Sequence, residues 1–359
     1  MTGRPMTAGF TAGGLPSAWR QSLPQIIALA AVLLADWLIF PDFFQVRLQD
    51  GRLFGSIVDV FNRGAPVAIL SIGMTLVIAT RGIDLSVGAV MAIAGAVAAT
   101  LINGGHGMAI AVLAALAVGI ACGLWNGLLV AVLDIQPIVA TLILMVAGRG
   151  IAQLITEGQI VTFVDPSLIA VANGSFLGIP MPVVITLAML AITVLLFRTT
   201  ALGLFIEAIG INRLSSTYAG VNTRIVLAIA YAWCGLTASV AGIIAAANIK
   251  GADANNAGLW LELDAILAVV IGGTSLFGGR FRLLLSFIGA IIIQAMNTGI
   301  LLSGFKPEFN LIVKAAVIIV ILIMQSDAPA LLHGRYRRWR DSPAPGRETP
   351  ERQAGGGAA

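Results

Sequence analysis

The sequence predicts an all-α integral membrane protein with about ten transmembrane helices, and three observations lead to this. The 359 residues are 58% hydrophobic and 11% charged, with a mean hydropathy of +0.97. A soluble chain has about a quarter of its residues charged. Apolar runs recur along the chain, and roughly 20 apolar helical residues cross a bilayer. Short polar interruptions separate these runs.

The apolar runs predict the spans and their orientation. They cover residues 25–40, 64–80, 85–102, 108–133, 138–156, 181–197, 225–247, 263–277, 283–302 and 309–325. An even number of spans places both termini on one side of the membrane. Arg and Lys are more numerous in the loops on that side, so the positive-inside bias makes it the cytoplasmic side.

The chain divides into one membrane domain and two tails. Residues 1–24 are rich in Gly, Ser, Pro and Thr and predict a disordered cytoplasmic tail. Residues 25–325 form the membrane domain. Residues 326–359 predict a basic, disordered cytoplasmic tail whose Arg cluster at 335–340 suits anionic lipid. We expect no nucleic-acid partner, because the arginines form no single patch on a soluble face.

Motifs for catalysis and cofactor binding are missing from the sequence. Lys250, Lys306 and Lys314 each follow a residue other than glycine, so no Gly-Lys-Ser/Thr phosphate loop exists. The two histidines and two cysteines are too few for a metal cluster or a disulfide framework. We predict a non-catalytic chain that binds no cofactor. If ATP drives it, a separate chain binds ATP and Mg and hydrolyses the nucleotide.

The segment 198–224 lies between two apolar runs and is polar enough to leave the membrane. Four of its apolar residues recur at i, i+3, i+4 and i+7, on one stripe of a helix: Leu202, Phe205, Ile206 and Ile209. A surface helix of this kind could dock in a groove on a soluble partner. We predict that a partner outside the membrane moves the spans through this segment.

Polar residues within or beside the spans are candidates for a translocation path, because such residues are scarce in membranes and often functional. Asp84 interrupts an apolar stretch at 82–88, where it either faces a path or caps a helix. The outer segment 248–264 ends in two carboxylates that either contact ligand or begin a helix. The path candidates, any of which could instead hold helices together, are Asp84, Ser86, Asn126, Gln153, Glu262, Asp264, Gln294 and Asn297.

Three further patterns carry predictions. Asp253, Asn255 and Asn256 offer hydrogen-bonding groups to a docking protein on the outer side. Gly119, Gly123 and Gly127 recur every four residues and predict a smooth helix face for close packing. The glycine-rich stretch 271–282 predicts a tight turn between two spans.

Three stretches of the chain resemble sugar-importing ABC-transporter permeases of the ribose/xylose/galactose class. They are residues 73–96 (GMTLVIATRGIDLSVGAVMAIAGA), the EAIG-x-N…AG pattern from Glu207 to Gly220, and residues 262–280 (ELDAILAVVIGGTSLFGGR). Residues 135–163 and 249–266 are most similar to permeases of galactofuranose importers. The sequence departs from the class at Ser215 and Ser216, where relatives often carry alanines, and at Arg81, where many carry glycine.

The resemblance implies an ABC importer permease fold with a cytoplasmic coupling helix, in a bacterial inner membrane. It implies three partners: an ATPase chain with two fused nucleotide-binding halves, a periplasmic sugar-binding protein and a second permease chain, either different or identical. The residues that it implies for contact with the ATPase are Leu202, Phe205, Ile206, Glu207, Ala208, Gly210, Asn212 and Gly220.

The transported monosaccharide that the resemblance favours is galactofuranose. Ribose, xylose, a nucleoside or an amino acid is the alternative within the superfamily. An ion-coupled secondary transporter is the alternative outside it, and Asp84 is the only carboxylate near enough to mid-membrane to serve such a mechanism.

Overall fold

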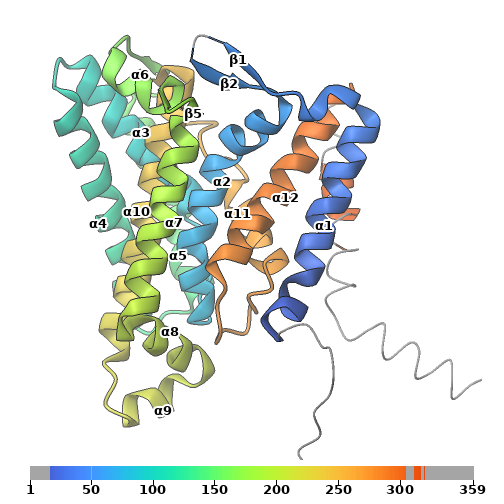
Figure 1. Ribbon diagram of the computed structural model, residues 1–359. Coiled ribbons are helices and arrows are strands. Elements are labelled where there is room, and N and C mark those ends of the chain that lie inside the picture. The colour runs from blue at the N-terminus through green and yellow to red at the C-terminus, as the bar shows by residue number, and fades with distance from the viewer. Residues whose placement is uncertain (1–16, 50, 305–310, 317–318, 320–359) are drawn as a thin grey trace, which may run out of the picture.

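The chain forms a bundle of long helices, with short strand pairs at one end and two short helices at the other (Figure 1). The computed structural model describes residues 17–49, 51–304, 311–316 and 319. The helices are α1 (Ser17–Ile39), α2 (Ser56–Ala79), α3 (Val87–Asn103), α4 (Met108–Ala131), α5 (Pro137–Ile155), α6 (Pro166–Asn173), α7 (Met181–Thr199), α8 (Ala201–Ile211), α9 (Arg213–Tyr218), α10 (Thr223–Ile249), α11 (Leu261–Ile271) and α12 (Leu283–Leu302). A 3-10 turn covers Pro41–Phe44.

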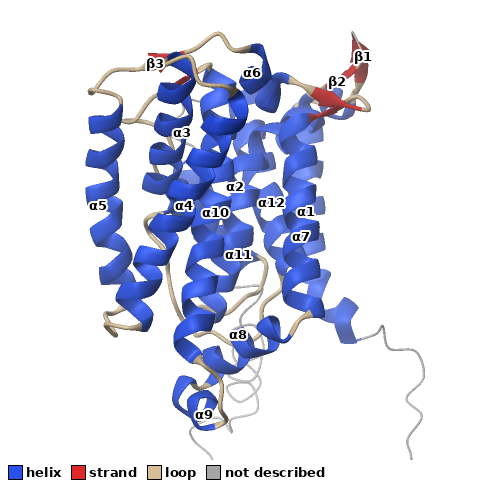
Figure 2. Ribbon diagram, turned by 90° about the vertical axis from the view of Figure 1, so that its left-hand side faces the viewer, coloured by secondary structure: helices blue, strands red, loops and turns tan. Residues whose placement is uncertain are grey.

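Three antiparallel strand pairs lie at one end of the bundle, which we call the strand end (Figure 2). They join β1 (Arg47–Gln49) to β2 (Arg52–Phe54), β3 (Val161–Thr162) to β6 (Gly251–Ala252), and β4 (Ser175–Phe176) to β5 (Ile179–Pro180). Helices α8 and α9 lie at the opposite end, which we call the α8 end. The strands therefore connect helices only outside the apolar body of the bundle.

Seven helices of the described residues are long and apolar enough to cross a membrane: α1, α2, α4, α5, α7, α10 and α12. The predicted spans at 85–102 and 263–277 correspond to α3 and α11, which have 17 and 11 residues. Helix α11 ends at Ile271 and is shorter than predicted. The tenth predicted span lies mostly outside the described residues, of which 311–316 are helical.

The predicted tails fall largely outside the described residues. Helix α1 begins at Ser17, so residues 17–24, which we assigned to the tail, are helical instead. Residues 1–16 and 326–359 are not described.

Helices α2 and α10 form the centre of the bundle, and α4 packs closely on α10. A Cβ on Gly127 would lie 2.9 Å from the Ala228 Cα, and one on Gly123 would lie 2.8 Å from the Ala232 Cα. Glycine at these positions lets the two backbones touch, and the van der Waals contact so gained stabilises helix pairs in lipid. The predicted smooth face on α4 is confirmed.

Helices α3 and α11 begin beside each other inside the bundle. A Cβ on Gly88, in the first turn of α3, would lie 2.6 Å from Glu262 Oε2 and would clash with the Gly258 carbonyl oxygen. From this meeting point α3 occupies the half near the strands and α11 the half near α8 (Figure 2). The non-helical segments 80–86 and 250–260, the second of which includes β6, take the place of helix in the other halves. Both spans are therefore discontinuous.

Candidate transport path and coupling segment

The coupling segment, residues 200–220, contains α8 and α9 and projects from the bundle (Figure 1). Polar side chains begin each helix. Thr200 Oγ1 accepts a hydrogen bond from Leu202 N at 3.3 Å, and Asn212 Oδ1 accepts one from Ser215 N at 3.0 Å. Gly220 ends the segment at a φ of +87°, a left-handed conformation that glycine adopts without strain.

The apolar stripe of α8 faces the chain's own core, which corrects the expectation that it docks on a partner. Ile206 and Ile209 are 0% and 2% exposed and pack in one cluster with Phe197 and Phe281. A Cβ on Gly210 would clash with the Ala79 carbonyl oxygen. Helical spacing identifies an apolar face but not the surface that covers it, and here the bundle itself covers it.

The outward face of the segment includes four large exposed hydrophobic residues that the sequence analysis did not single out. Leu204, Ile211, Leu214 and Tyr218 are 69%, 64%, 63% and 82% exposed. Of the eight residues implied for coupling, Ile206 and Gly210 are buried, and Asn212 and Gly220 are exposed. The other four are partly buried: Leu202, Phe205, Glu207 and Ala208.

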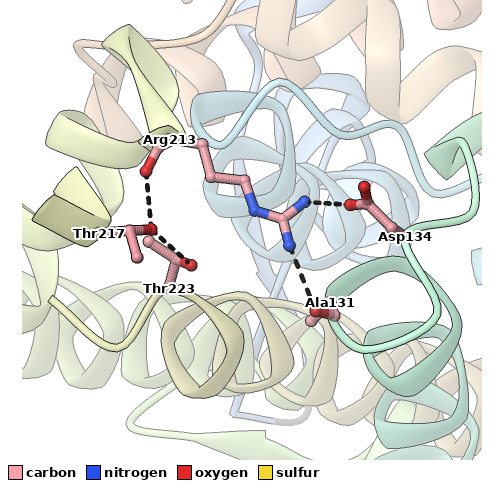
Figure 3. A network of polar contacts seen from close by, with 5 residues as sticks. All are labelled: Ala131, Asp134, Arg213, Thr217 and Thr223. Carbon is pink, nitrogen blue, oxygen red and sulfur yellow. Dashed lines mark hydrogen bonds and ion pairs between the residues drawn. The ribbon is translucent and has the colours of Figure 1, made fainter. Parts of the chain in front are cut away.

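Arg213 ties α9 to the turn between α4 and α5 (Figure 3). Its guanidinium donates to Asp134 Oδ1 at 2.7 Å and to the Ala131 carbonyl oxygen at 3.2 Å. Thr217 Oγ1 donates to the Arg213 carbonyl oxygen at 3.0 Å and lies 3.4 Å from Thr223 Oγ1. Asp134 is largely exposed, so the ion pair itself stabilises the fold little. Its two bonds instead fix the orientation of α9.

Three path candidates, Asp84, Ser86 and Asn126, form one buried cluster. Asp84 Oδ1 accepts hydrogen bonds from Ser86 N at 2.9 Å and Ser86 Oγ at 2.6 Å. Asn126 Nδ2 donates to Ser86 Oγ at 2.8 Å. All three are at most 1% exposed, within a core that includes Tyr231 and Cys234. Asp84 therefore closes the turn that precedes α3, whereas Ser86, the N-cap residue of α3, makes no side-chain capping bond.

Glu262 and Asp264 have different surroundings in the first turn of α11. Glu262 Oε2 lies close to Gly88 in the first turn of α3. Both Asp264 oxygens accept from Lys314 Nζ, at 2.8 and 3.0 Å, and the two side chains are 12% and 11% exposed. The sequence analysis did not find this partner. The sequence did indicate that Asp264 has a cationic partner, because a carboxylate inside a span usually pairs with one.

The three docking candidates form a structured turn after β6. Asp253 Oδ1 accepts from Asn255 N at 3.0 Å and Asn256 N at 3.2 Å. Asn256 Nδ2 donates to Asp253 Oδ2 at 2.7 Å, and this bond lowers the pKa of Asp253 below its ordinary value. On α5, Gln153 Nε2 donates to Asn255 Oδ1 at 2.7 Å, and Arg149 donates to two carbonyl oxygens of the same turn.

A cavity of about 210 Å³ lies between this turn, α3 and α10. Its lining is mostly apolar and includes Met91, Gly95, Gly242, Ala246, Asp253 and Asn256. Two of the docking candidates, Asp253 and Asn256, line it. Gln153 bonds to Asn255, which lies in the turn that lines one side of this cavity.

Gln294 and Asn297 lie on α12, on a different helix from the Asp84 cluster. Gln294 is 8% exposed and donates to Thr298 Oγ1 at 3.5 Å. Asn297 Oδ1 has no hydrogen-bond partner among the described residues. Asp36 on α1, which the sequence analysis missed, is 5% exposed and packs against Gly299 of α12. These side chains fit interhelical contacts better than one continuous path.

Comparison with known proteins places this arrangement in a family. Residues 56–322 match the profile described as "Branched-chain amino acid transport system / permease component". The chain belongs to this permease family. It is a multi-pass membrane protein, as the apolar helices indicate. No solved structure matches it.

Three curated permeases are similar over most of their length. The chain is 65% identical over 309 residues to the galactofuranose transporter permease protein YtfT of Escherichia coli, covering 86% of this chain and 91% of the relative. It is 42% identical over 324 residues to the fructose import permease protein FruF of Bifidobacterium longum, covering 88% and 90%. It is 36% identical over 313 residues to the ribose import permease protein RbsC of Escherichia coli, covering 86% and 95%. The resemblance found in the sequence is confirmed.

Proposed function

We propose that this chain is the permease subunit of an ATP-driven ABC importer that carries galactofuranose across a bacterial inner membrane. One observation carries the proposal, namely 65% identity across 91% of the length of a galactofuranose permease. The fructose and ribose permeases, at 42% and 36% identity, make other sugars the alternatives. The chain itself catalyses nothing in this proposal and binds no cofactor.

The α8 end is the cytoplasmic end in this proposal, and both termini lie on that side. An ATPase chain with two fused nucleotide-binding halves, which holds ATP and Mg, docks on the outward face of α8 and α9. Exposed Leu204, Ile211, Leu214 and Tyr218 support this, because an apolar patch outside the membrane suits a protein partner. A second permease chain, identical or homologous, lies beside this one in the membrane, in contact with lipid.

The strand end faces the periplasm and receives a sugar-binding protein. The turn of Asp253, Asn255 and Asn256 suits this contact, because its own hydrogen bonds hold exposed polar groups in a fixed geometry. Sugar then passes along the discontinuous spans. Helix interruptions in transporters commonly mark the substrate route, since unwound backbone is tolerated where it lines a cavity.

The transport step is a change in the relative stability of outward-facing and inward-facing arrangements. ATP binding changes that balance only if the ATPase interacts differently with the two. The coupling segment is the part of this chain through which such a difference acts.

The experiment is uptake in Escherichia coli cells that lack YtfT and receive this chain. Labelled galactofuranose should accumulate, and unlabelled ribose or fructose in excess should compete weakly. An inactive ATPase should abolish accumulation, whereas a proton uncoupler in the presence of ATP should not. Accumulation that requires the proton gradient and not ATP would contradict the proposal, and stronger competition by ribose would reassign the sugar.

A further inference from the structure

Arg81 occupies a backbone position that glycine would fill with less strain. It follows the end of α2 at a φ of 66°, in the left-handed region that few side chains adopt. Such strain persists where the surroundings require it, often at functional positions. The Arg81 side chain therefore warrants an explanation beyond the turn itself.

The Arg81 guanidinium bridges two segments that are distant in the sequence. Nε donates to the Phe277 carbonyl oxygen at 2.8 Å, and Nη2 donates to the Ile211 carbonyl oxygen at 2.7 Å. Ile211 is the last residue of α8. Phe277 belongs to residues 272–282, which we call the α11–α12 loop.

Backbone contacts bring the same three segments together. Gly279 N donates to the Ala79 carbonyl oxygen at 2.9 Å. A Cβ on Gly210 would clash with that same oxygen and with Gly279 N. The ends of α2 and α8 and the α11–α12 loop therefore meet at one point, and Arg81 joins all three.

Arg198 holds the loop at a second point. Its Nη2 donates to the Phe281 carbonyl oxygen at 2.6 Å, and its guanidinium lies 4.6 Å from the centre of the Phe281 ring. It also pairs with Glu207 of α8 at 3.6 Å. Phe281 is 1% exposed and packs with Ile206 and Ile209. The loop is thus attached to α8 through both of its phenylalanines.

The loop directly follows α11, which is shorter than the helices long enough to cross a membrane. Its 11 residues are about 16 Å long at 1.5 Å per residue. Its far end carries Glu262 and Asp264 beside the start of α3. Its N-terminal end follows a turn that Arg149 and Gln153 hold, and its C-terminal end joins the loop, so a displacement of the loop acts directly on α11.

We propose that Arg81 is a positioning residue that ties α8 to the α11–α12 loop, so that displacement of α8 moves α11 with Glu262 and Asp264. The inference rests on the proposed function, because the ATPase is what displaces α8. It adds the route by which that displacement reaches the interior of the membrane.

The test measures sugar transported per ATP hydrolysed by the reconstituted complex of permease, ATPase and binding protein. Arg81→Gly removes both side-chain bonds and suits the left-handed backbone, so the fold should be retained. ATP hydrolysis should persist while transport per ATP falls roughly 5- to 150-fold, the usual range of coupling between sites. Arg81→Lys keeps the positive charge but loses the planar guanidinium, so transport per ATP should fall less in this variant than in Arg81→Gly.

Arg280→Ala is the matched control. Arg280 lies in the same loop, is exposed and makes no hydrogen bond or ion pair with the other described residues. Its loss removes the same charge from the same end of the molecule and should leave the ratio unchanged. An equal fall in Arg280→Ala and Arg81→Gly would overturn the proposal, because charge alone would then explain both.

Hydrogen exchange gives a second readout that a purely structural role would not move. In the wild-type complex, ATP should change exchange in both α8 and α11. In Arg81→Gly the change should remain in α8 and disappear from α11. If Arg81→Gly shows the same transport per ATP and the same exchange pattern as the wild type, Arg81 does not connect α8 to α11 and the proposal is overturned. A wild-type complex that hydrolyses ATP without moving sugar would instead refute the proposed function.

Discussion

The buried ion pair of Asp264 and Lys314 can be tested directly by mutation. Both carboxylate oxygens bond to one ammonium, at 2.8 and 3.0 Å, and both side chains are nearly nine-tenths buried. We consider Asp264→Asn, Lys314→Met and the double variant. Each single change leaves one charge in an apolar site, and the double change leaves none.

The burial of the pair sets the magnitude. Removing one member of a buried pair costs about 3–5 kcal/mol, because the other charge is left uncompensated. At 1.4 kcal/mol per factor of ten, each single variant should unfold with an equilibrium constant at least about 100-fold larger. The double variant should lose no more than either single variant, because neutral groups of similar volume replace a buried pair at little net change.

Reversible unfolding in mixed detergent micelles measures the three free energies, and the double-mutant cycle gives the interaction. Lys250→Met is the control, since Lys250 is exposed and should shift stability by no more than about 0.5 kcal/mol. If the single effects add in the double variant within about 0.5 kcal/mol, the pair does not interact and the reasoning fails.

Three further predictions follow from the packing and the surface. Gly123→Val should destabilise the bundle by about 1–3 kcal/mol, because the α10 backbone already fills the space that the new side chain would need. Gly150→Val is the control and should not destabilise it, because nothing lies within 4 Å of a Cβ there. The same unfolding assay measures both variants. Leu214→Asp on the outward face should weaken capture of the ATPase in a pull-down, while Ser275→Asp, which adds the same charge outside the coupling segment, should not; equal losses would assign the effect to charge. The Asn256 bond lowers the folded pKa of Asp253, so its turn should be ordered above the ordinary carboxylate pKa and loosen only as the pH falls through the lowered value. Hydrogen exchange of the turn amides measures this, and loosening on going to alkaline pH would contradict it.

The parts of the fold that the sequence predicted depend on local properties. A span is recognisable because most of its residues are apolar over about 20 positions, as α4 and α5 confirm. The smooth face at Gly123 was recognisable because close helix contact needs small residues at helical spacing. The break at Asp84 was recognisable because a carboxylate and two glycines interrupt an apolar run.

The parts that the sequence did not predict depend on distant residues. Nothing local to Asp264 identifies Lys314, which is 50 positions away. The spacing of the apolar residues of α8 is that of a helix that docks on a partner. A helix that packs against its own chain has the same spacing, so the spacing does not distinguish the two. Helix α11 ends at Ile271, where Gly272 and Gly273 begin the predicted turn, so the span predicted to reach residue 277 extended too far into that turn.

Three buried carboxylates lie near the place where α3 and α11 begin. Glu262 lies close to the first turn of α3, and Asp264 is balanced by Lys314. Asp84 holds the turn that enters α3. Because Asp84 and Asp264 already bond to Ser86 and Lys314, we expect the selection of sugar to depend on other groups, among which Gln153 and Asn255 are exposed at the strand end.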